Sequence, residues 1–288
     1  MIGRFAPSPT GTLHLGNLRT ALLAWLFARS AGSRFLVRME DLDAGRVRPG
    51  VAEEQLADLA AIGIDWDGEV VQQSARGDRY AAAIERLGAA GRLYECFCTR
   101  AEIREAASAP HGPQGHYPGT CLRLTDAERE QRRATRAPAL RVRADGERVE
   151  FADRLHGATG GVVDDFVVRR NDGATAYNLA VVVDDAAQGV EEVVRGDDLL
   201  DSTPRQLFLA RQLGLPEPSY AHVPLVLGPD GARLAKRHGA VTLREVPAGA
   251  AKAWMLESLN LPADLAPGAF DPAAIPRRPT RFEGVEPT

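Results

Sequence analysis

The chain has 288 residues, of which 44% are hydrophobic and 26% are charged, and its formal net charge is −4. This length is enough for one large domain or two modest domains with an ample core. The composition is ordinary for a globular protein, and the net charge excludes a uniformly basic nucleic-acid-binding protein, so an RNA ligand would need a local basic surface. No apolar run approaches the roughly 18 residues of a membrane span, and the first residues resemble no signal peptide. We therefore expect a cytoplasmic protein that makes no membrane contact.

Residues 2–17 predict a short strand, a tight turn and the start of a helix. Residues 2–6 have the pattern of a strand, and the two prolines that follow prevent further strand pairing or a helix. The helical apolar spacing of residues 18–31 then places His14 and Asn17 at a helix N-terminus. Free N–H groups and the helix dipole make such a position a phosphate site. Both usual phosphate-loop motifs are absent, and a purely structural loop is the alternative interpretation.

The next elements predict an α/β fold with a parallel sheet. Residues 34–38 predict a second strand that runs into a cluster of acids, and residues 51–62 and 76–90 predict helices. Ligands of such sheets bind outside the carboxyl ends of the strands, where Glu40 and Asp41 would lie. On chemistry alone, an acid that binds an ammonium group and a solvated surface carboxylate are equally good interpretations.

All three cysteines, Cys96, Cys98 and Cys121, lie within 26 residues of each other. An odd number of cysteines in an intracellular chain argues against a disulfide framework. The spacing suits a tetrahedral structural zinc site that needs a fourth ligand. Because imidazole is the usual partner of thiolates, His116 or His111 is the fourth ligand that chemistry alone favours. Three unrelated buried cysteines are the alternative.

Two stretches of the chain are notably basic. Residues 123–143 contain seven arginines and three acids, which is a local charge of about +4. A solvated helical face explains this run as well as an RNA contact does. Residues 233–239 form a second basic loop, and this loop holds Lys236, one of only two lysines in the chain.

The second half of the chain predicts more strands. Residues 162–168 and 175–183 flank an Asn-Asp-Gly turn and predict a hairpin, and the apolar run to residue 185 predicts a buried strand. Ser202 before Pro204 predicts a helix start that continues through residue 213. Residues 223–227 predict a further strand.

The motifs resemble those of class I glutamyl-tRNA synthetases. Residues 4–11 (Arg-Phe-Ala-Pro-Ser-Pro-Thr-Gly) and 14–17 (His-Leu-Gly-Asn) resemble the first signature motif, with Asn in place of the last His. Residues 233–239 resemble the KMSKS loop, with Arg for the first Lys and Ala for Ser. The order and spacing of motifs from residue 2 to about residue 245 are most similar to the short relatives that act on queuosine in tRNA(Asp). The resemblance implies a class I synthetase Rossmann-type parallel sheet, a zinc-containing insertion and a short, partly helical C-terminal region.

The resemblance also implies roles for individual residues. It implies catalysis by His14, Asn17 and Lys236, ATP binding by His14, Gly16, Asn17 and Lys236, and glutamate binding by Arg4, Phe5, Ala6, Pro7, Ser8, Glu40, Tyr177 and Arg195. Glu40 would hold the ammonium group, and the arginines would select a carboxylate. The implied zinc ligands are Cys96, Cys98, Tyr117 and Cys121, so Tyr117 replaces the histidine that chemistry alone favours.

The activity implied is the ATP-dependent activation of L-glutamate, with Mg²⁺, and its transfer to queuosine in the anticodon of tRNA(Asp). The implied domains are a catalytic domain of residues 1–93 and 179–232, a zinc-binding and tRNA-contacting insertion of residues 94–178, and a region of residues 233–288 with the KMSKS-like loop and a truncated stem contact. No anticodon-binding domain is expected. The alternatives are ordinary glutamyl-tRNA synthesis at a tRNA 3′ end and a non-catalytic RNA-binding remnant. We expect a monomer without an obligate protein partner.

Overall fold

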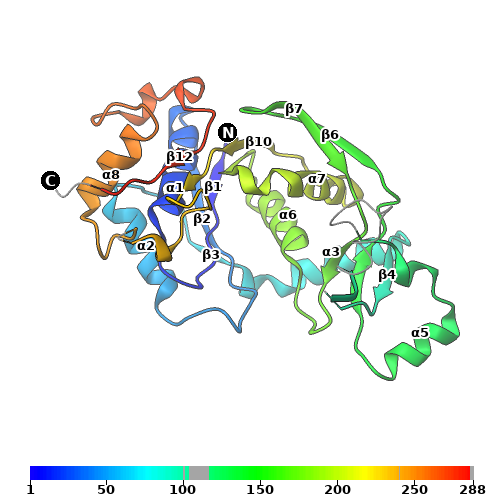
Figure 1. The fold of residues 1–288 in the computed structure, drawn as a ribbon. Coiled ribbons are helices and arrows are strands. Elements are labelled where there is room, and N and C mark those ends of the chain that lie inside the picture. Colours follow the sequence, from blue (N-terminus) through cyan, green and yellow to red (C-terminus); the bar gives the residue numbers. More distant parts are fainter. Residues whose placement is uncertain (100, 104–116, 240, 286–288) are drawn as a thin grey trace.

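The computed structural model describes residues 1–99, 101–103, 117–239 and 241–285 (Figure 1). The central sheet is built from two hydrogen-bonded groups of strands. The first group has the order β1 (Gly3–Phe5), β2 (Phe35–Met39) and β3 (Val71–Gln72), and all its pairs are parallel. The second has the order β7 (Gly157–Val162), β6 (Arg148–Asp153), β10 (Ser219–Val223) and β9 (Glu192–Gly196), and only the β6–β7 pair is antiparallel. Because the N–H groups of Glu191 and Glu192 both donate to the Ile2 carbonyl, β9 lies beside β1. The carboxyl ends of β1, β2 and β9 therefore meet at one edge, as the predicted α/β fold requires.

Buried apolar side chains hold helices against both groups of strands. One cluster joins the first group to α1 (Leu15–Ser30), α2 (Val51–Ala61) and α8 (Ala248–Glu257). A second cluster joins β6 and β8 (Phe166–Arg169) to α3 (Gly77–Ala89), α6 (Tyr177–Gln188) and α7 (Thr203–Gln212). Figure 1 shows α1, α2 and α8 on the side of β1 and β2, and α6 and α7 on the side of β6 and β10.

The predicted insertion of residues 94–178 has a small core of its own, although its strands β6 and β7 belong to the second group. An antiparallel sheet of β4 (Leu93–Cys96), β5 (Ala139–Val142) and β8 lies beside a short turn of helix, Thr120–Arg123. Tyr94, Cys96, Phe97, Tyr117 and Cys121 are the buried members of this core. Helix α5 (Asp126–Arg133) projects from it and buries none of its side chains. Its N-terminus is closed by a capping box between Thr125 and Glu128, which explains why so polar a segment is helical.

The region after residue 247 packs onto α1. Strand β12 (Thr280–Arg281) pairs in parallel with β11 (Val226–Leu227). The side chain of Arg19, which is only 1% exposed, donates to Ser258 and Thr280 of this region and to the carbonyl of Pro224. These buried contacts fix the C-terminal region against the first helix of the sheet. No helix among the described residues has the length and apolar character needed to cross a bilayer.

The predicted hairpin of residues 162–168 and 175–183 is confirmed only at its turn, where Arg169 and Thr175 form an antiparallel bridge. Val162 is the last residue of β7, and β8 belongs to another sheet. The bridge between Arg169 and Thr175 is not extended into a second strand, because α6 begins at Tyr177. The apolar run that was expected as a buried strand is helix α6, in which residues 179–185 are all buried. A continuous apolar run does not distinguish a buried strand from a helix that is packed on several sides, and α6 contacts α3, α7 and β8.

Two smaller expectations also differ from the structure. Residues 223–227 form the end of β10 and the whole of β11 rather than one strand. Ser202 precedes α7, but its hydroxyl donates to the carbonyl of Leu199 instead of capping the helix. The predicted α/β class with its parallel sheet is confirmed. The boundary expected between residues 178 and 179 falls in the first turn of α6.

Candidate active site

The turn between β1 and α1 places His14 and Asn17 at the N-terminus of α1. His14 is the N-cap residue, and its Nδ1 accepts the backbone N–H of Asn17 at 3.2 Å. In return the Asn17 side-chain oxygen accepts the N–H of His14 at 3.4 Å, which completes a capping box. Gly16 permits this arrangement because a Cβ there would lie 3.0 Å from the His14 Nδ1. The structure therefore brings together the three residues of this motif at the positive end of a helix dipole.

A buried network of charges lies at the carboxyl ends of β1 and β2. Asp185 of α6 accepts from Arg4 at 3.3 Å and from Arg38 at 2.8 Å. Arg38, which is fully buried, also contacts Glu40 at 3.4 Å. Burial alone would raise the pKa of Asp185, but Arg4 and Arg38 together hold it below its usual range. Burial raises the pKa of Glu40, against the lowering effect of Arg38 and Arg4.

Arg195 of β9 differs from Arg4 and Arg38 because its partners are neutral. It is 5% exposed, and it donates to His222 at 3.0 Å, to Gln206 at 2.7 Å and to Thr203 at 2.8 Å. Among the described residues, no carboxylate forms an ion pair with it. A buried guanidinium without a counter-charge is costly unless a ligand supplies one. Arg195 is therefore a candidate for binding an anionic group.

These groups line one cavity of about 160 Å³. Nine of the residues singled out from the sequence contribute to its wall: Arg4, Phe5, Ala6, His14, Gly16, Asn17, Glu40, Tyr177 and Arg195. The cavity thus combines a helix N-terminus, a buried carboxylate and a buried guanidinium. That set of groups can hold phosphates, an ammonium group and a carboxylate at the same time.

A second, larger cavity of about 770 Å³ adjoins the first and shares Glu40 and Tyr177 with it. Ser8 lines this second cavity rather than the first. Its wall reaches the insertion at Cys98 and Arg141. Pro7 lines neither cavity, although its carbonyl accepts the N–H of Glu40 and so ties the first loop to the end of β2. The two cavities together connect the sheet edge with the insertion.

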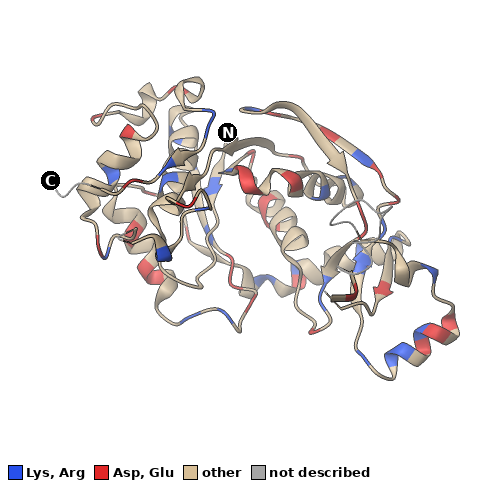
Figure 2. Cartoon of the chain, viewed as in Figure 1, with Lys and Arg blue, Asp and Glu red and all other residues tan. Residues whose placement is uncertain are grey.

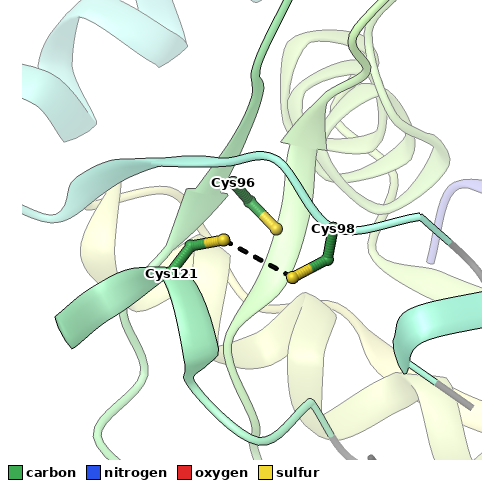
Figure 3. Close-up of side chains that lie close together, drawn as sticks. All are labelled: Cys96, Cys98 and Cys121. Atoms are coloured by element: carbon green, nitrogen blue, oxygen red, sulfur yellow. Dashed lines mark hydrogen bonds between the residues drawn. The ribbon is translucent and has the colours of Figure 1, made fainter. Parts of the chain in front are cut away.

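The three thiols lie together in the small core of the insertion (Figure 3). The sulfurs of Cys96, Cys98 and Cys121 lie within 4.8 Å of one another, and the Cys98–Cys121 distance is 3.4 Å. The Tyr117 hydroxyl lies 3.5 Å from the Cys96 sulfur and 3.7 Å from the Cys98 sulfur. The guanidinium of Arg141 stacks over the Tyr117 ring at 3.7 Å in a cation–π contact, and burial raises the pKa of the Tyr117 hydroxyl. Three thiols and one phenol fit a closed tetrahedral zinc site.

The rival zinc ligands His116 and His111 lie outside the described residues. The side chain of Lys236 is likewise outside the description, although its backbone forms a short turn with His238. The loop that holds this turn is attached to the first cavity, because Arg233 contacts Asp198 at 2.5 Å and both residues line that cavity. His14 lines the same cavity, and the role of Lys236 stays a prediction.

Three of the seven arginines in the basic run of residues 123–143 form ion pairs: Arg133, Arg136 and Arg143. Figure 2 shows acidic and basic residues side by side on α5. Arg133 pairs with Glu95 at 2.8 Å and with Glu130 at 2.9 Å. Arg136 pairs with Glu102 at 3.5 Å. These exposed pairs agree with a solvated helical face, and a contact with RNA would have to exchange them for phosphates.

Several residues of the site were not singled out from the sequence, namely Arg38, Asp153, Asp185, Gln206 and His222. Asp185 lies on α6, which was expected as a strand, so the side to which it points could not be foreseen. His222 and Asp153 lie on separate strands and meet only through the pairing of β6 with β10. The one available signal was the Asp-Asp pair that ends the apolar run, because charges directly after buried residues need partners.

The parallel sheet, the capped helix N-terminus beside it and the charged cavity at the strand ends define a class I aminoacyl-tRNA synthetase fold. Residues 1–254 match the family described as "tRNA synthetases class I (E and Q), catalytic domain", and the chain belongs to this family. It is 63% identical over 291 residues to a protein of Nocardia farcinica named Glutamyl-Q tRNA(Asp) synthetase, a match that covers 96% of this chain and 91% of the relative. A protein of the same name from Symbiobacterium thermophilum is 50% identical over 309 residues, which cover 98% of this chain and 96% of the relative.

A solved structure supports the same fold. The glutamate tRNA ligase of Elizabethkingia meningosepticum, determined in complex with its amino acid, is 26% identical and has a TM-score of 0.84. The match covers 98% of this chain and 67% of the ligase. The chain therefore shares its architecture with a glutamate enzyme and has much higher sequence identity with the Glutamyl-Q relatives.

Proposed function

We propose that the chain activates L-glutamate with ATP and transfers it to queuosine in the anticodon of tRNA(Asp). The observation that carries the first half is Arg195, a buried guanidinium with neutral partners that lines the same cavity as Glu40 and the N-terminus of α1. The observation that supports the second half is the similarity to relatives named Glutamyl-Q tRNA(Asp) synthetase, at 63% and 50% identity.

In the activation step the protein positions glutamate and ATP and stabilises their charges. The α-carboxylate of glutamate attacks the α-phosphate of ATP, a P–O bond to the leaving group breaks, and glutamyl-adenylate and pyrophosphate result. Glu40 would bind the ammonium group, and Arg4 and Arg195 would bind the side-chain carboxylate, with Tyr177 and residues 5–8 shaping the pocket. Holding both reactants in one geometry supplies much of the rate acceleration.

The phosphates of ATP belong at the N-terminus of α1 in this proposal. His14, Gly16 and Asn17 would face the phosphates there, and preorganised N–H groups would stabilise the negative charge that develops in the transition state. Lys236 would contact the leaving phosphates from its loop. ATP is used with Mg²⁺ by class I synthetases, and the ion would provide additional counter-charge.

The zinc would be held by Cys96, Cys98, Tyr117 and Cys121, and four protein ligands would make it structural rather than catalytic.

The proposed domains divide activation, tRNA contact and loop closure among three parts of the chain. Residues 1–93 and 179–232 would carry activation, residues 94–178 would carry the zinc and contact tRNA, and residues 233–288 would supply the KMSKS-like loop and a short stem contact. The second cavity, which joins Glu40 to the insertion, is where the acceptor nucleoside would reach the adenylate.

The choice of acceptor is tested by a charging assay with labelled glutamate. We expect transfer to tRNA(Asp) that contains queuosine and none to tRNA(Asp) that lacks it. Periodate oxidises a free cis-diol, so charging should survive oxidation of the terminal ribose only when the queuosine diol is protected. Efficient charging of unmodified tRNA(Glu) at its 3′ end would favour the ordinary glutamyl-tRNA synthetase. Failure of glutamate to support pyrophosphate exchange would favour a non-catalytic RNA-binding protein.

A test of the phosphate site is the substitution Gly16→Ala. The new Cβ would lie 3.0 Å from the His14 Nδ1 and would displace the ring from its capping position. Since a displacement of about 1 Å at a reacting centre can cost about a hundredfold in rate, we expect pyrophosphate exchange to slow roughly 10- to 100-fold. Gly77→Ala, at the first residue of α3, is the matched control because a Cβ there meets nothing within 4 Å. Equal rates for both variants would remove His14 from the reaction.

A further inference from the structure

Arg195 is connected to a buried carboxylate through a histidine. Asp153 of β6 lies 2.6 Å from Nδ1 of His222, and Nε2 of the same ring lies 3.0 Å from Nε of Arg195. His222 is completely buried, and Asp153 is 3% exposed. The three side chains therefore form a hydrogen-bonded relay that runs from β6 across β10 to β9, and of the three only Arg195 lines the first cavity.

The hydrogen bonds decide the protonation state of the ring. An arginine Nε always carries its hydrogen, so Nε2 of His222 must accept. The ring proton then lies on Nδ1 and is donated to Asp153, which also accepts the backbone N–H groups of Leu155 and His156 at 2.9 Å. Burial lowers the pKa of His222 below its usual range, against the raising effect of Asp153, and the charge of Arg195 adds to the lowering. A neutral imidazole thus separates the carboxylate from the guanidinium.

Gln206 completes the arrangement on the other side of the guanidinium. Its side-chain oxygen accepts from Nη1 of Arg195 at 2.7 Å, and it is 1% exposed. Nη2 is fixed by Thr203 at 2.8 Å. All these partners orient the guanidinium, and none of them neutralises it. Arg4 and Arg38 differ, because both pair directly with Asp185.

We propose that Asp153 and His222 position Arg195 while withholding a counter-charge from it, so that the site selects a substrate side chain that ends in a carboxylate over one that ends in an amide. This inference rests on the proposed activation of glutamate. His222 and Asp153 line neither of the two cavities that hold Glu40 and Tyr177, so they act through Arg195 and are positioning residues rather than catalytic ones. An uncompensated buried guanidinium gains most from an anionic ligand, whereas a neutral amide would leave its charge unpaired.

Two substitutions of His222 distinguish a role in positioning Arg195 from a role in maintaining the fold. In the complete protein, His222→Gln can keep an acceptor near the position of Nε2, whereas His222→Asn keeps a donor near Nδ1 and removes the acceptor from Arg195. We expect His222→Asn to raise the KM for glutamate in pyrophosphate exchange roughly 10- to 100-fold, because a hydrogen bond to a charged group is lost. The KM for ATP should stay unchanged in both variants, and His222→Gln should restore most of the affinity for glutamate.

The substitution Gln206→Glu tests the withheld charge without touching the histidine. The change is isosteric and places a carboxylate against Nη1 of Arg195. We expect the ratio of kcat/KM for glutamate to that for glutamine to fall at least tenfold. An unchanged ratio, together with equal glutamate KM values for the two His222 variants, would overturn the inference while the wild-type protein still activates glutamate. A wild-type protein that fails to exchange pyrophosphate with glutamate would instead overturn the proposed function, and the inference with it.

Discussion

Glu40→Gln is expected to raise the KM for glutamate at least a hundredfold in pyrophosphate exchange. The carboxylate of Glu40 lines the first cavity and is 9% exposed. Arg38 contacts Glu40 at 3.4 Å, but Asp185 pairs with both Arg4 and Arg38. Glu40 is the carboxylate of this network that lines the cavity, so it is the one that can face the substrate ammonium group. Leaving a buried charge without its partner costs about 3–5 kcal/mol, and each 1.4 kcal/mol is roughly tenfold in affinity.

The matched control is Asp41→Asn, which removes the same charge one residue further along the chain. Asp41 accepts from the backbone N–H and the hydroxyl of Ser74 at an exposed position, so we expect its loss to leave the KM for glutamate unchanged. The pH dependence gives a second comparison. Because burial raises the pKa of Glu40, the affinity of the wild-type protein for glutamate should fall as the pH drops through that raised value. A wild-type pH profile in the Gln variant would remove Glu40 from the ammonium site.

The first loop was predictable because its structure is set by local residues. The prolines end β1, and His14 and Asn17 satisfy each other's N–H groups across three residues. The clustering of the thiols was also visible, since C-x-C spacing brings two sulfurs together without help from the rest of the fold. In both cases the predicted arrangement depends mainly on residues that are close in the sequence, and needs few contacts between distant parts of the chain.

The predictions that were wrong concern elements whose structure depends on tertiary packing. The run Leu179–Val183 is apolar on every side, and only the helices and strands around it decide that it is helical. The error concealed Asp185, since one residue of shift on a strand or helix changes the direction of a side chain. The Asp153–His222–Arg195 relay spans three strands, so no spacing in the sequence could reveal it.

The zinc prediction carries the largest expected effect on stability. Cys98→Ser is expected to abolish the binding of one zinc per chain, because the remaining ligands no longer complete a tetrahedral set of soft donors. The small core of Tyr94, Cys96, Phe97, Tyr117 and Cys121 is too limited to hold the insertion strongly by itself. Structural zinc in small domains contributes about 10–16 kcal/mol of apparent binding free energy, so thermal unfolding of the variant should begin at a markedly lower temperature. Full zinc content after this substitution would contradict the site.

Substitutions of two buried tyrosines in the same core identify the fourth zinc ligand. Tyr117→Phe removes the hydroxyl that lies 3.5 Å and 3.7 Å from two of the sulfurs, and we expect it to weaken zinc binding strongly. Tyr94→Phe is the control, because that hydroxyl donates to Asp165 at 2.7 Å and should leave the zinc content intact. If Tyr117→Phe retains one zinc while His116→Ala loses it, His116 is the ligand. The cation–π contact between Arg141 and the Tyr117 ring would then serve packing alone.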